Sequence, residues 1–413
     1  MKTPIEKIYS SSTSLEECDF ISTLFNKKDL ALIKSGEKVI IYGAGSAGGE
    51  IYDVLQLHGV DVEFFCDKSA DLSEKKLRDK LVISPKALCD GYKDRLVVIG
   101  VQKYKKEILN FLRNSGFNRI AMIESDEQFY YYLQFPRWKN NLENLKQDET
   151  LITRGYELME DQISQEIFIK RLAILSSYAD YRAYREYCKF SQAPSSLPEE
   201  KKIFASNFEN EMYFNNDLIK LHHANNLVDC GAFDGDSLLQ WKIQMQKENL
   251  TEGKAYCFEP DDANFKNLQT NVNDYKNVEI FNLGVWNCET TLEFASSETT
   301  FITESCVVEQ SSHDKVIRNV GNTYIKANSI DNVIYPKKVD IIKMDVEGSE
   351  ANALIGAKKT IQKWRPQLII SAYHKSSDLY NLPILINELC PQYKIYLRQY
   401  SYSWSETVLI AVM

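Results

Sequence analysis

The 413-residue sequence lacks several signals that would assign it to a common class of protein. Its nine cysteines are scattered, without a C-x-x-C pair or a cysteine–histidine cluster at zinc spacing, which excludes the usual zinc modules and favours free thiols in a reducing compartment. No apolar stretch reaches the roughly 20 residues that a membrane-spanning helix needs. The opening residues, MKTPIEKIYSSSTSLEE, lack the apolar core of a secretory signal. We therefore expect a cytoplasmic protein without a membrane span.

An excess of positive charge is also missing. The formal net charge is −9 at pH 7, so the basic face that a nucleic-acid-binding protein usually needs is not indicated, and we expect no nucleic-acid partner. Hydrophobic residues make up 44% of the chain and charged residues 26%, as in ordinary globular proteins. A chain of this length is expected to form two or three domains.

The order of apolar patterns indicates an α/β protein with two sheet-forming parts. Alternating strand and helix patterns predict a mostly parallel sheet in each part, and the second part ends in two apolar strands joined by a polar turn. The helical pattern between these parts predicts a connector, which leaves open an internal role or an interface in a homo-oligomer. The predicted segments are an N-terminal helical segment (1–36), a Rossmann-like domain (37–125), the helical connector (126–206) and a second α/β domain (207–413).

A glycine-rich turn follows the first predicted strand. Gly43, Gly45 and Gly48 form G-x-G-x-x-G after KVIIY, and Ser46 lies within the turn. Asp67 follows the next strand, about 24 residues after Gly43, where an acid that binds a ribose is expected. The pattern is typical of a dinucleotide site, so an NAD(P)-binding oxidoreductase is one hypothesis. A module that binds another nucleotide, or a Rossmann unit without a ligand, is the alternative.

The first strand of the second α/β domain ends in an acid-rich loop, VDCGAFDGDS. Gly231 allows a close backbone approach, while Asp229, Asp234 and Asp236 crowd one turn and would repel a pyrophosphate. A ligand that carries an ammonium and a sulfonium, such as S-adenosylmethionine (SAM), suits this loop better. Taken singly, these acids can also be explained as helix caps. Glu259 ends the second strand, roughly 28 residues past Gly231, where a carboxylate accepts ribose hydroxyls.

Polar residues also end the fourth and fifth strands of this domain. Lys343, Asp345 and Glu347 interrupt an apolar segment, and burying such groups is costly unless they are paired or functional. His374 follows the fifth strand at its carboxyl edge, where it could act as a general base, with Asp345 or Glu347 as alternative bases. Asp345 and Glu347 are also candidate ligands for Mg²⁺, which prefers carboxylate oxygens.

Six segments in order resemble the FkbM-type SAM-dependent methyltransferases, over residues 207–413: VDCGAFDGDS, CFEPDDANFKNL, NLGVWN, IIKMDVEGSEANALIGAKKTI, PQLIISAYHKSSDLYNLPILINEL and LRQYSYSWSETVLIAV. The resemblance implies a class I seven-stranded methyltransferase fold, with SAM held at the glycine loop, the ribose by the next acid and adenine at the third strand. The residues so implied are Asp229, Gly231, Ala232 and Asp234 for SAM, Glu259 for ribose, Asn282, Leu283 and Gly284 for adenine, and Asp345 and Glu347 at the reaction centre.

The same resemblance implies transfer of a methyl group to a hydroxyl of a sugar, a nucleotide-linked sugar or a glycan. YGAGSAGGEIYDVL, FFCDKS and RLVVIGV resemble the small nucleotide-sugar-binding domain of bacterial sugar N-acyltransferases. Together the two resemblances imply a role in bacterial surface polysaccharide synthesis. An NAD(P)-dependent or bifunctional oxidoreductase, and a glycan-assembly scaffold that has lost activity, are the alternative hypotheses.

Overall fold

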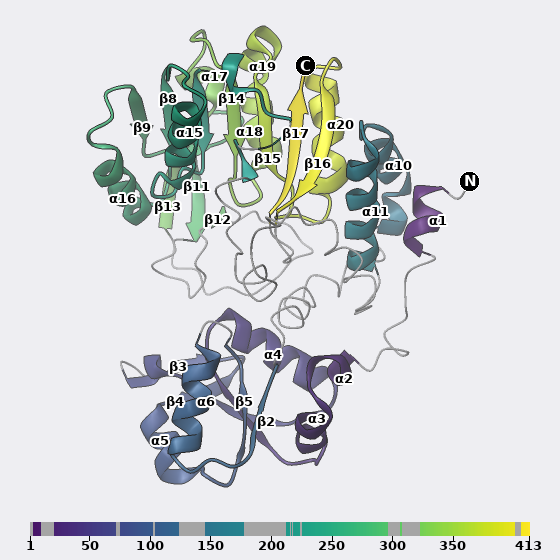
Figure 1. Cartoon of the computed structure of the whole chain (residues 1–413), viewed down its shortest axis with the longest axis vertical. Coiled ribbons are helices and arrows are strands. Elements are labelled where there is room, and N and C mark those ends of the chain that lie inside the picture. The colour runs from purple at the N-terminus through teal and green to yellow at the C-terminus, as the bar shows by residue number, and fades with distance from the viewer. Residues whose placement is uncertain are drawn as a thin grey trace. The chain divides into compact units, whose positions relative to one another are not determined.

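The chain divides into two compact units (Figure 1). The N-terminal unit comprises Ile8–Asn144 with Ala173–Glu186, and the C-terminal unit comprises Met1–Lys7, Leu145–Leu172 and Tyr187–Met413. The structure is a computed structural model. It describes residues 3–9, 20–71, 75–101, 104–123, 145–176, 212–214, 216, 218–223, 225–295, 306–307, 323–400 and 406–413.

The N-terminal unit contains a six-stranded sheet in the order β3-β4-β2-β1-β5-β6. All neighbouring strands are parallel except β3, which runs antiparallel to β4. This confirms the predicted α/β class. The sequence predicted four of these strands and missed the pair β3 and β4, because their residues, KKLRDKLVI, mix charged and apolar side chains in short runs.

The elements described in the N-terminal unit follow one another as strands and helices. They are α2 (Phe20–Leu24), α3 (Lys27–Ile33), β1 (Val39–Tyr42), α4 (Ser46–Leu57), β2 (Val62–Cys66), η2 (Lys68–Asp71), β3 (Lys75–Leu77), β4 (Lys80–Ile83), α5 (Pro85–Gly91), β5 (Leu96–Ile99), α6 (Lys105–Asn114) and β6 (Ile120–Met122).

The C-terminal unit contains a seven-stranded sheet in the order β16-β17-β15-β14-β7-β8-β9. The five strands from β15 to β9 are parallel, and β17 runs antiparallel to both β15 and β16. The predicted parallel sheet closed by an antiparallel hairpin is therefore confirmed. The central strands are buried along their whole length, as continuous apolar runs in parallel sheets usually are.

The C-terminal unit also contains the elements that flank this sheet. In chain order the described elements are α1 (Pro4–Tyr9, at the boundary of the units), α10 (Glu149–Glu157), α11 (Gln162–Ser176, whose last residues belong to the N-terminal unit), η3 (Leu221–His223), β7 (Leu227–Cys230), α15 (Asp236–Lys247), β8 (Ala255–Phe258), α16 (Asp262–Val272), β9 (Val278–Phe281), β10 (Gly284–Val285), β11 (Thr290–Ala295), β12 (Cys306–Val307), β13 (Thr323–Asn328), α17 (Ile330–Val333), β14 (Ile341–Met344), α18 (Glu350–Gly356), α19 (Lys358–Trp364), β15 (Gln367–Ser371), α20 (Asp378–Leu389), β16 (Lys394–Gln399) and β17 (Thr407–Val412).

A second, four-stranded sheet follows β9 in the C-terminal unit, in the order β10-β13-β11-β12. The apolar stretch VEIFNLGVWN predicts one continuous strand, but the strand ends at Phe281 and a new one begins at Gly284 in this other sheet. Alternation of apolar residues cannot reveal such a change of partner, because both strands have the same period.

Part of the predicted helical connector packs against the C-terminal sheet. Helix α10 contacts α20 (Figure 1), and Met159 forms an isolated parallel bridge with Ile395 of β16. Asp161 pairs with Arg398 of the same strand at 2.7 Å, and the Arg398 side chain is buried. Residues 145–172 thus cover an edge strand of the sheet, whereas the predicted boundaries at 36, 125 and 206 stay predictions. Among the described residues, no helix combines the length and apolarity needed to cross a membrane.

Candidate functional site

Four neighbouring strands of the C-terminal sheet end at one edge. Strands β8, β7, β14 and β15 are parallel, and their pairing places Asp229 opposite Lys343 and Cys230 opposite Met344. The residues that follow each strand therefore lie at one carboxyl edge, where open α/β sheets bind ligands. This edge brings together the predicted residues Gly231, Glu259, Asp345 and His374.

Asp229 and Lys343 form a buried ion pair beneath this edge. Lys343 Nζ lies 3.2 Å from Asp229 Oδ1 and donates to the Gly231 carbonyl at 2.8 Å. Burial raises the pKa of Asp229 to about 6, although Lys343 acts in the opposite direction. Burial also opposes the charge on Lys343, but nearby acids outweigh it and raise the lysine pKa.

The Asp229 carboxylate makes no well-aligned hydrogen bond with any described residue, although the side chain is fully buried. Lys343 Nζ, at 3.2 Å from Oδ1, is the cation beside this carboxylate, whose two oxygens can accept further hydrogen bonds from a ligand. The ammonium group of an amino-acid ligand is a donor of the required charge. This supports the predicted role of Asp229 in binding the amino-acid end of SAM.

The loop after β7 turns sharply at Gly231, whose φ is +76°. A Cβ atom at this position would lie 1.8 Å from the carbonyl oxygen of Asp345. Gly231 therefore allows a close approach to the end of the neighbouring strand β14. The close approach to a ligand stays a prediction. Both Gly231 and the buried Ala232 donate their backbone N–H to Phe258 O of β8, which fixes the loop over the sheet edge.

Glu259 follows β8 and lies beside the same loop. Its Oε2 accepts the N–H of Phe233 at 3.0 Å, and its Oε1 accepts the N–H of Asp261 at 2.9 Å. Burial raises the pKa of Glu259 to about 7, against these two hydrogen bonds, which lower it. Each carboxylate oxygen can accept more than one hydrogen bond, so the geometry is compatible with the predicted contact to ribose hydroxyls.

The other residues predicted to bind the cofactor are Asp234, Asp236, Asn282, Leu283 and Gly284. Asp236 is the first residue of α15 and accepts the N–H of Ser237, so a local helix-end role is sufficient for it. Asp234 is partly exposed, and burial with the charge of Asp236 raises its pKa. Asn282 and Leu283 link β9 to β10. Asn282 donates to Asp262 Oδ1 at 2.7 Å, and Gly284 is buried in β10.

Asp345 follows β14 and is held by two tyrosines. Tyr213 donates to Asp345 Oδ2 and Tyr373 donates to Oδ1, both at 3.2 Å. Burial opposes ionisation of Asp345, but His374 and Lys343 outweigh it and lower the carboxyl pKa. The carboxylate is therefore charged and fixed in orientation.

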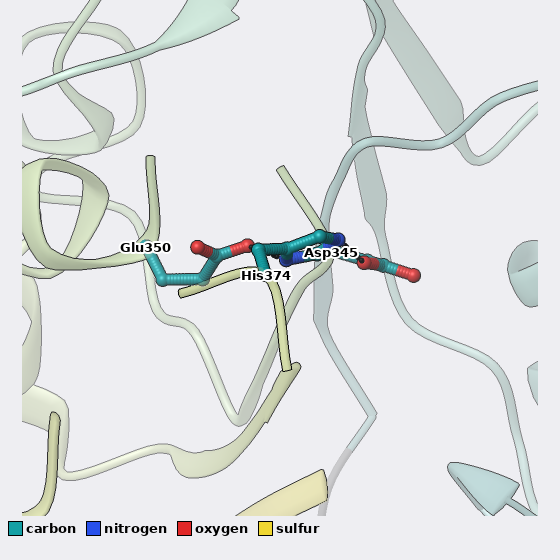
Figure 2. A group of neighbouring side chains, drawn as sticks. All are labelled: Asp345, Glu350 and His374. Atoms are coloured by element: carbon teal, nitrogen blue, oxygen red, sulfur yellow. Dashed lines mark ion pairs between the residues drawn. The ribbon is translucent and has the colours of Figure 1, made fainter. Parts of the chain in front are cut away.

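His374 lies among three carboxylates. Its Nδ1 is 2.9 Å from Glu350 Oε1, and its Nε2 is 3.4 Å from Asp345 Oδ1 and 3.3 Å from Glu347 Oε2. Figure 2 shows the imidazole between the carboxylates of Glu350 and Asp345. Burial lowers the pKa of His374, but Glu350 and Glu347 outweigh this and raise it well above the usual value.

Three residues of this cluster were not predicted from the sequence: Tyr213, Glu350 and Tyr373. Glu350 is fully buried in the first turn of α18 and accepts the N–H of Val346 at 3.0 Å. A buried acid in an otherwise apolar helix, ANALIG, was a signal that could have identified it. Tyr213 precedes the first strand of the sheet, so no local pattern links it to Asp345.

The glycine loop of the N-terminal unit also packs closely on its neighbours and also has an acid beside it. A Cβ at Gly43 would lie 2.5 Å from Val101 Cγ1, and one at Gly48 would lie 2.0 Å from the Gly43 carbonyl oxygen. These two glycines therefore allow the loop to pack closely against β5 and α4, whereas Gly45 has open space. Asp67 accepts the N–H of Ala44 at 3.0 Å. Ser46 begins α4, and its side chain lies outside the described part of the chain.

Each unit contains a segment that matches a known family model. Residues 229–402 match the family model described as the methyltransferase FkbM domain, and residues 35–123 match one described as C2185-like, N-terminal. The crystal structure of methyltransferase FkbM from Methylobacillus flagellatus KT is similar over 99% of both chains, with a TM-score of 0.58 and 18% sequence identity. No curated protein sequence matches the chain.

Two further solved structures share less of the fold. Aeropyrum pernix fibrillarin with natively bound S-adenosyl-L-methionine has a TM-score of 0.28 at 11% identity, over 47% of this chain and 69% of its own. Precorrin-6y C5,15-methyltransferase from Geobacter metallireducens GS-15 has a TM-score of 0.27 at 10% identity, over 54% and 93%. The methyltransferase assignment of residues 229–402 therefore comes from the family match, and the full-length structural likeness shows the fold.

Proposed function

Since residues 229–402 form an FkbM methyltransferase domain, we propose that the protein transfers a methyl group from SAM to a hydroxyl oxygen. The observation that carries the proposal is the fully buried Asp229 carboxylate, which pairs with Lys343 and can accept a further donor, at the edge where Glu259 also lies. An ammonium at Asp229 and ribose hydroxyls at Glu259 would satisfy both carboxylates. SAM held there would supply the methyl group, and Asp345 follows the neighbouring strand β14.

The cluster beyond this cofactor position supports oxygen as the methyl acceptor. Methyl transfer to a hydroxyl needs the oxygen held in line with the sulfonium, and a group that takes its proton. Both ring nitrogens of His374 face carboxylates within 3.4 Å, so neither is directed at an acceptor. Asp345 and Glu347 are therefore better placed than His374 to accept the proton. Mg²⁺ at these two acids stays a prediction.

We further infer that the acceptor is a sugar, a nucleotide-linked sugar or a glycan of a bacterial surface polysaccharide pathway. The N-terminal unit supports a nucleotide-linked acceptor, because Asp67 follows β2 and contacts the glycine loop as a ribose-binding acid would. Strand β5, which pairs with β1, ends at Ile99, and the described residues that follow it, Gly100 and Val101, carry no polar side chain for hydride-transfer chemistry. This argues for a binding module over an NAD(P)-dependent oxidoreductase. A cytoplasmic location and a homo-oligomer stay predictions.

The first experiment measures SAM binding by calorimetry in the wild-type protein, in Asp229→Asn and in the surface control Glu279→Gln. We expect at least a tenfold loss of affinity in Asp229→Asn, because the amide removes the charge that attracts the ammonium. The control, whose carboxylate pairs with exposed lysines, should match the wild type. Equal affinity in all three proteins would contradict the assignment.

The second experiment screens SAM turnover against nucleotide sugars and short glycans by mass spectrometry. A product that is heavier by one methyl group identifies the acceptor class. If SAM binds but no hydroxyl-bearing acceptor is methylated, the O-methyltransferase proposal fails and an inactive scaffold is favoured.

A further inference from the structure

Both ring nitrogens of His374 lie against carboxylates. Nδ1 is 2.9 Å from Glu350 Oε1, and Nε2 is 3.4 Å from Asp345 Oδ1 and 3.3 Å from Glu347 Oε2. A neutral imidazole has one N–H group and one bare nitrogen, which acts as an acceptor. On either side of this ring, a bare nitrogen would face the lone pairs of a carboxylate and would be repelled. The protonated ring carries an N–H on both nitrogens, so the geometry fits an imidazolium.

The imidazole connects two neighbouring strand ends. His374 follows β15, whereas the three carboxylates lie between the end of β14 and the first turn of α18. Glu350 is fully buried, and its Oε1 accepts the backbone N–H groups of Val346 and Gly348 at 3.0 and 3.4 Å. Figure 2 shows the ring between Glu350 and Asp345. Glu350 is therefore a fixed anchor for one side of the ring.

The surroundings of the ring favour its charged form. The side chain of His374 is only 6% exposed, and burial lowers its pKa, but Glu350 and Glu347 outweigh burial and raise the pKa well above its usual value. The Tyr373 ring lies against the imidazole, with 4.2 Å between the ring centroids and 41° between the planes. Aromatic rings attract cations to their faces, so this contact also favours the imidazolium.

A fourth acid acts on the imidazole from helix α20. Asp378, the first residue of α20, is buried and accepts the backbone N–H of Lys375 at 2.8 Å. Burial raises the pKa of Asp378 to about 7, and the charge of Glu350 adds to this, whereas His374 and Lys375 lower it. A protonated imidazole therefore also favours the ionised form of this acid.

We propose that His374 is a positioning residue, a fixed cation that holds the carboxylates of Asp345 and Glu347 together at the sheet edge where the acceptor hydroxyl is proposed to bind. Two carboxylates at one place repel each other unless a positive charge lies between them. Nε2 is the atom that both of them approach. The inference rests on the proposed function, and it gives His374 no proton transfer of its own.

The backbone at Glu347 supports this role. Its φ is +53°, in the left-handed region that a glutamate rarely adopts. Such a conformation persists only where the surrounding structure holds it, and it is found most often at functional sites. The ion pair with His374 is one of the contacts that hold it. The Glu347 side chain is 27% exposed, so it stays accessible to an acceptor at this edge.

The role of His374 divides the chemistry among three residues. In the proposed transfer, the hydroxyl oxygen forms a bond to the methyl carbon while the carbon–sulfur bond breaks. The electron pair of that bond stays on sulfur, and the hydroxyl proton passes to Asp345 or Glu347. Although burial opposes ionisation of Asp345, His374 lowers the pKa of its carboxyl. Asp345 is then a weak base that orients the hydroxyl and takes the proton only as the new bond forms.

The charge on His374 is tested by nitrogen-15 NMR of the full chain, labelled at its five histidines. At about pH 8, a histidine with the ordinary pKa of about 6.5 is neutral and has one bare ring nitrogen. We expect one ring of the wild type to show two protonated nitrogens at this pH. This signal should be absent in His374→Gln and present in the control Glu279→Gln. If no ring of the wild type is doubly protonated, or if the signal persists in His374→Gln, the proposal is wrong.

The anchor is tested by Glu350→Gln, which keeps the shape of the side chain and removes its charge. The ring of His374 should then lose its second proton about 1–3 pH units lower than in the wild type, since an opposite charge at this distance has an effect of that size. An unchanged midpoint would overturn the role of Glu350 as the anchor.

Crystal structures of variants test the positioning itself. We expect the Glu347 carboxylate to turn away from Asp345 in His374→Gln, and to stay beside it in His374→Lys, which restores a cation. Circular dichroism confirms that each variant is folded. An unchanged position of Glu347 in folded His374→Gln would show that the imidazolium does not hold it.

Calorimetry of SAM binding to the wild type separates this inference from the proposed function. A wild type that binds SAM and has a neutral His374 refutes the positioning cation alone. A wild type that has the doubly protonated ring and binds no SAM refutes the methyltransferase proposal alone.

Discussion

The two glycine loops of this protein share one pattern of backbone hydrogen bonds to an acid and differ in the neighbouring side chains. In the N-terminal unit, Asp67 accepts backbone N–H groups from Ala44 of the loop and from Ser69, two residues further on. In the C-terminal unit, Glu259 accepts them from Phe233 and Asp261 in the same pattern. The acid after the second strand therefore does not distinguish one ligand from another.

The two units differ in the residues at the ends of the strands beside each loop. In the N-terminal unit, β1 ends in Tyr42 and β5 is followed by Gly100. In the C-terminal unit, the first strand carries the buried Asp229 and the adjacent strand carries Lys343, with Asp345 directly after it. A glycine loop with an acid beside it is thus common to both units, whereas among the described residues the buried Asp229–Lys343 pair has no counterpart in the N-terminal sheet.

The largest effect is expected where the C-terminal loop packs most tightly. Gly231→Ala would place Cβ 1.8 Å from the Asp345 carbonyl oxygen at a φ of +76°, so the loop must shift. We expect a loss of more than ~3 kcal/mol in the free energy of unfolding and loss of SAM binding, measured by denaturant titration and calorimetry. Gly59→Ala is the matched control. It has a φ of +71° and open space, so about 1–2 kcal/mol is expected. Equal losses would show that strain alone, without the collision, explains the effect.

The next effect compares the two acids. Glu259→Gln should weaken SAM binding by about 10- to 100-fold, because hydrogen bonds to a charged acceptor contribute about 1.5–3 kcal/mol. Asp67→Asn, in the equivalent position, should leave SAM affinity unchanged. A loss of SAM affinity in Asp67→Asn would remove the functional distinction between the loops.

A smaller, pH-dependent effect follows from the pKa of Glu259, which burial raises from 4.5 to about 7. Ribose hydroxyls donate to the ionised carboxylate, so SAM binding must release the proton. Affinity should fall about tenfold for each pH unit between about 7 and 6, and Glu259→Gln should flatten this part of the profile. Below about pH 6 the Asp229 carboxylate also takes up a proton, so affinity should fall further in both proteins. Without ligand the sign is opposite: folding is favoured at low pH, and this contribution is lost as the pH rises from about 4.5 through 7. A flat binding profile in the wild type would refute the assignment.

The smallest effect concerns Phe233, a partly exposed residue with a left-handed φ of 49°. No such strain is found at Ala44, its counterpart in the N-terminal loop. Phe233→Gly should stabilise the ligand-free protein by about 0.5 kcal/mol, because relief of strain slightly exceeds the added chain entropy. Asn249→Gly, at a φ of 56°, is the control and should show no gain, since asparagine tolerates this conformation. Thermal unfolding measures the change in stability, and a lower melting temperature in Phe233→Gly than in the wild type would contradict the prediction.

The sequence predicted the sheet of the C-terminal unit well, because buried parallel strands leave long apolar runs that end in polar residues. It placed Asp229, Glu259, Asp345 and His374 at strand ends for the same reason. It could not predict that Glu350 would face Nδ1 of His374, since that contact depends on how α18 enters the site. The contact of Tyr213 with Asp345 spans 132 positions along the chain and has no local signal.

The short bridge between Met159 and Ile395 ties the segment before residue 207 to strand β16 of the C-terminal sheet. A fragment that begins at residue 207 would keep every residue proposed for catalysis and lose the segment that covers β16. It would also leave the guanidinium of Arg398 buried without Asp161. An uncovered edge strand is a template for pairing with other copies, so such a fragment should aggregate while the full chain stays dispersed.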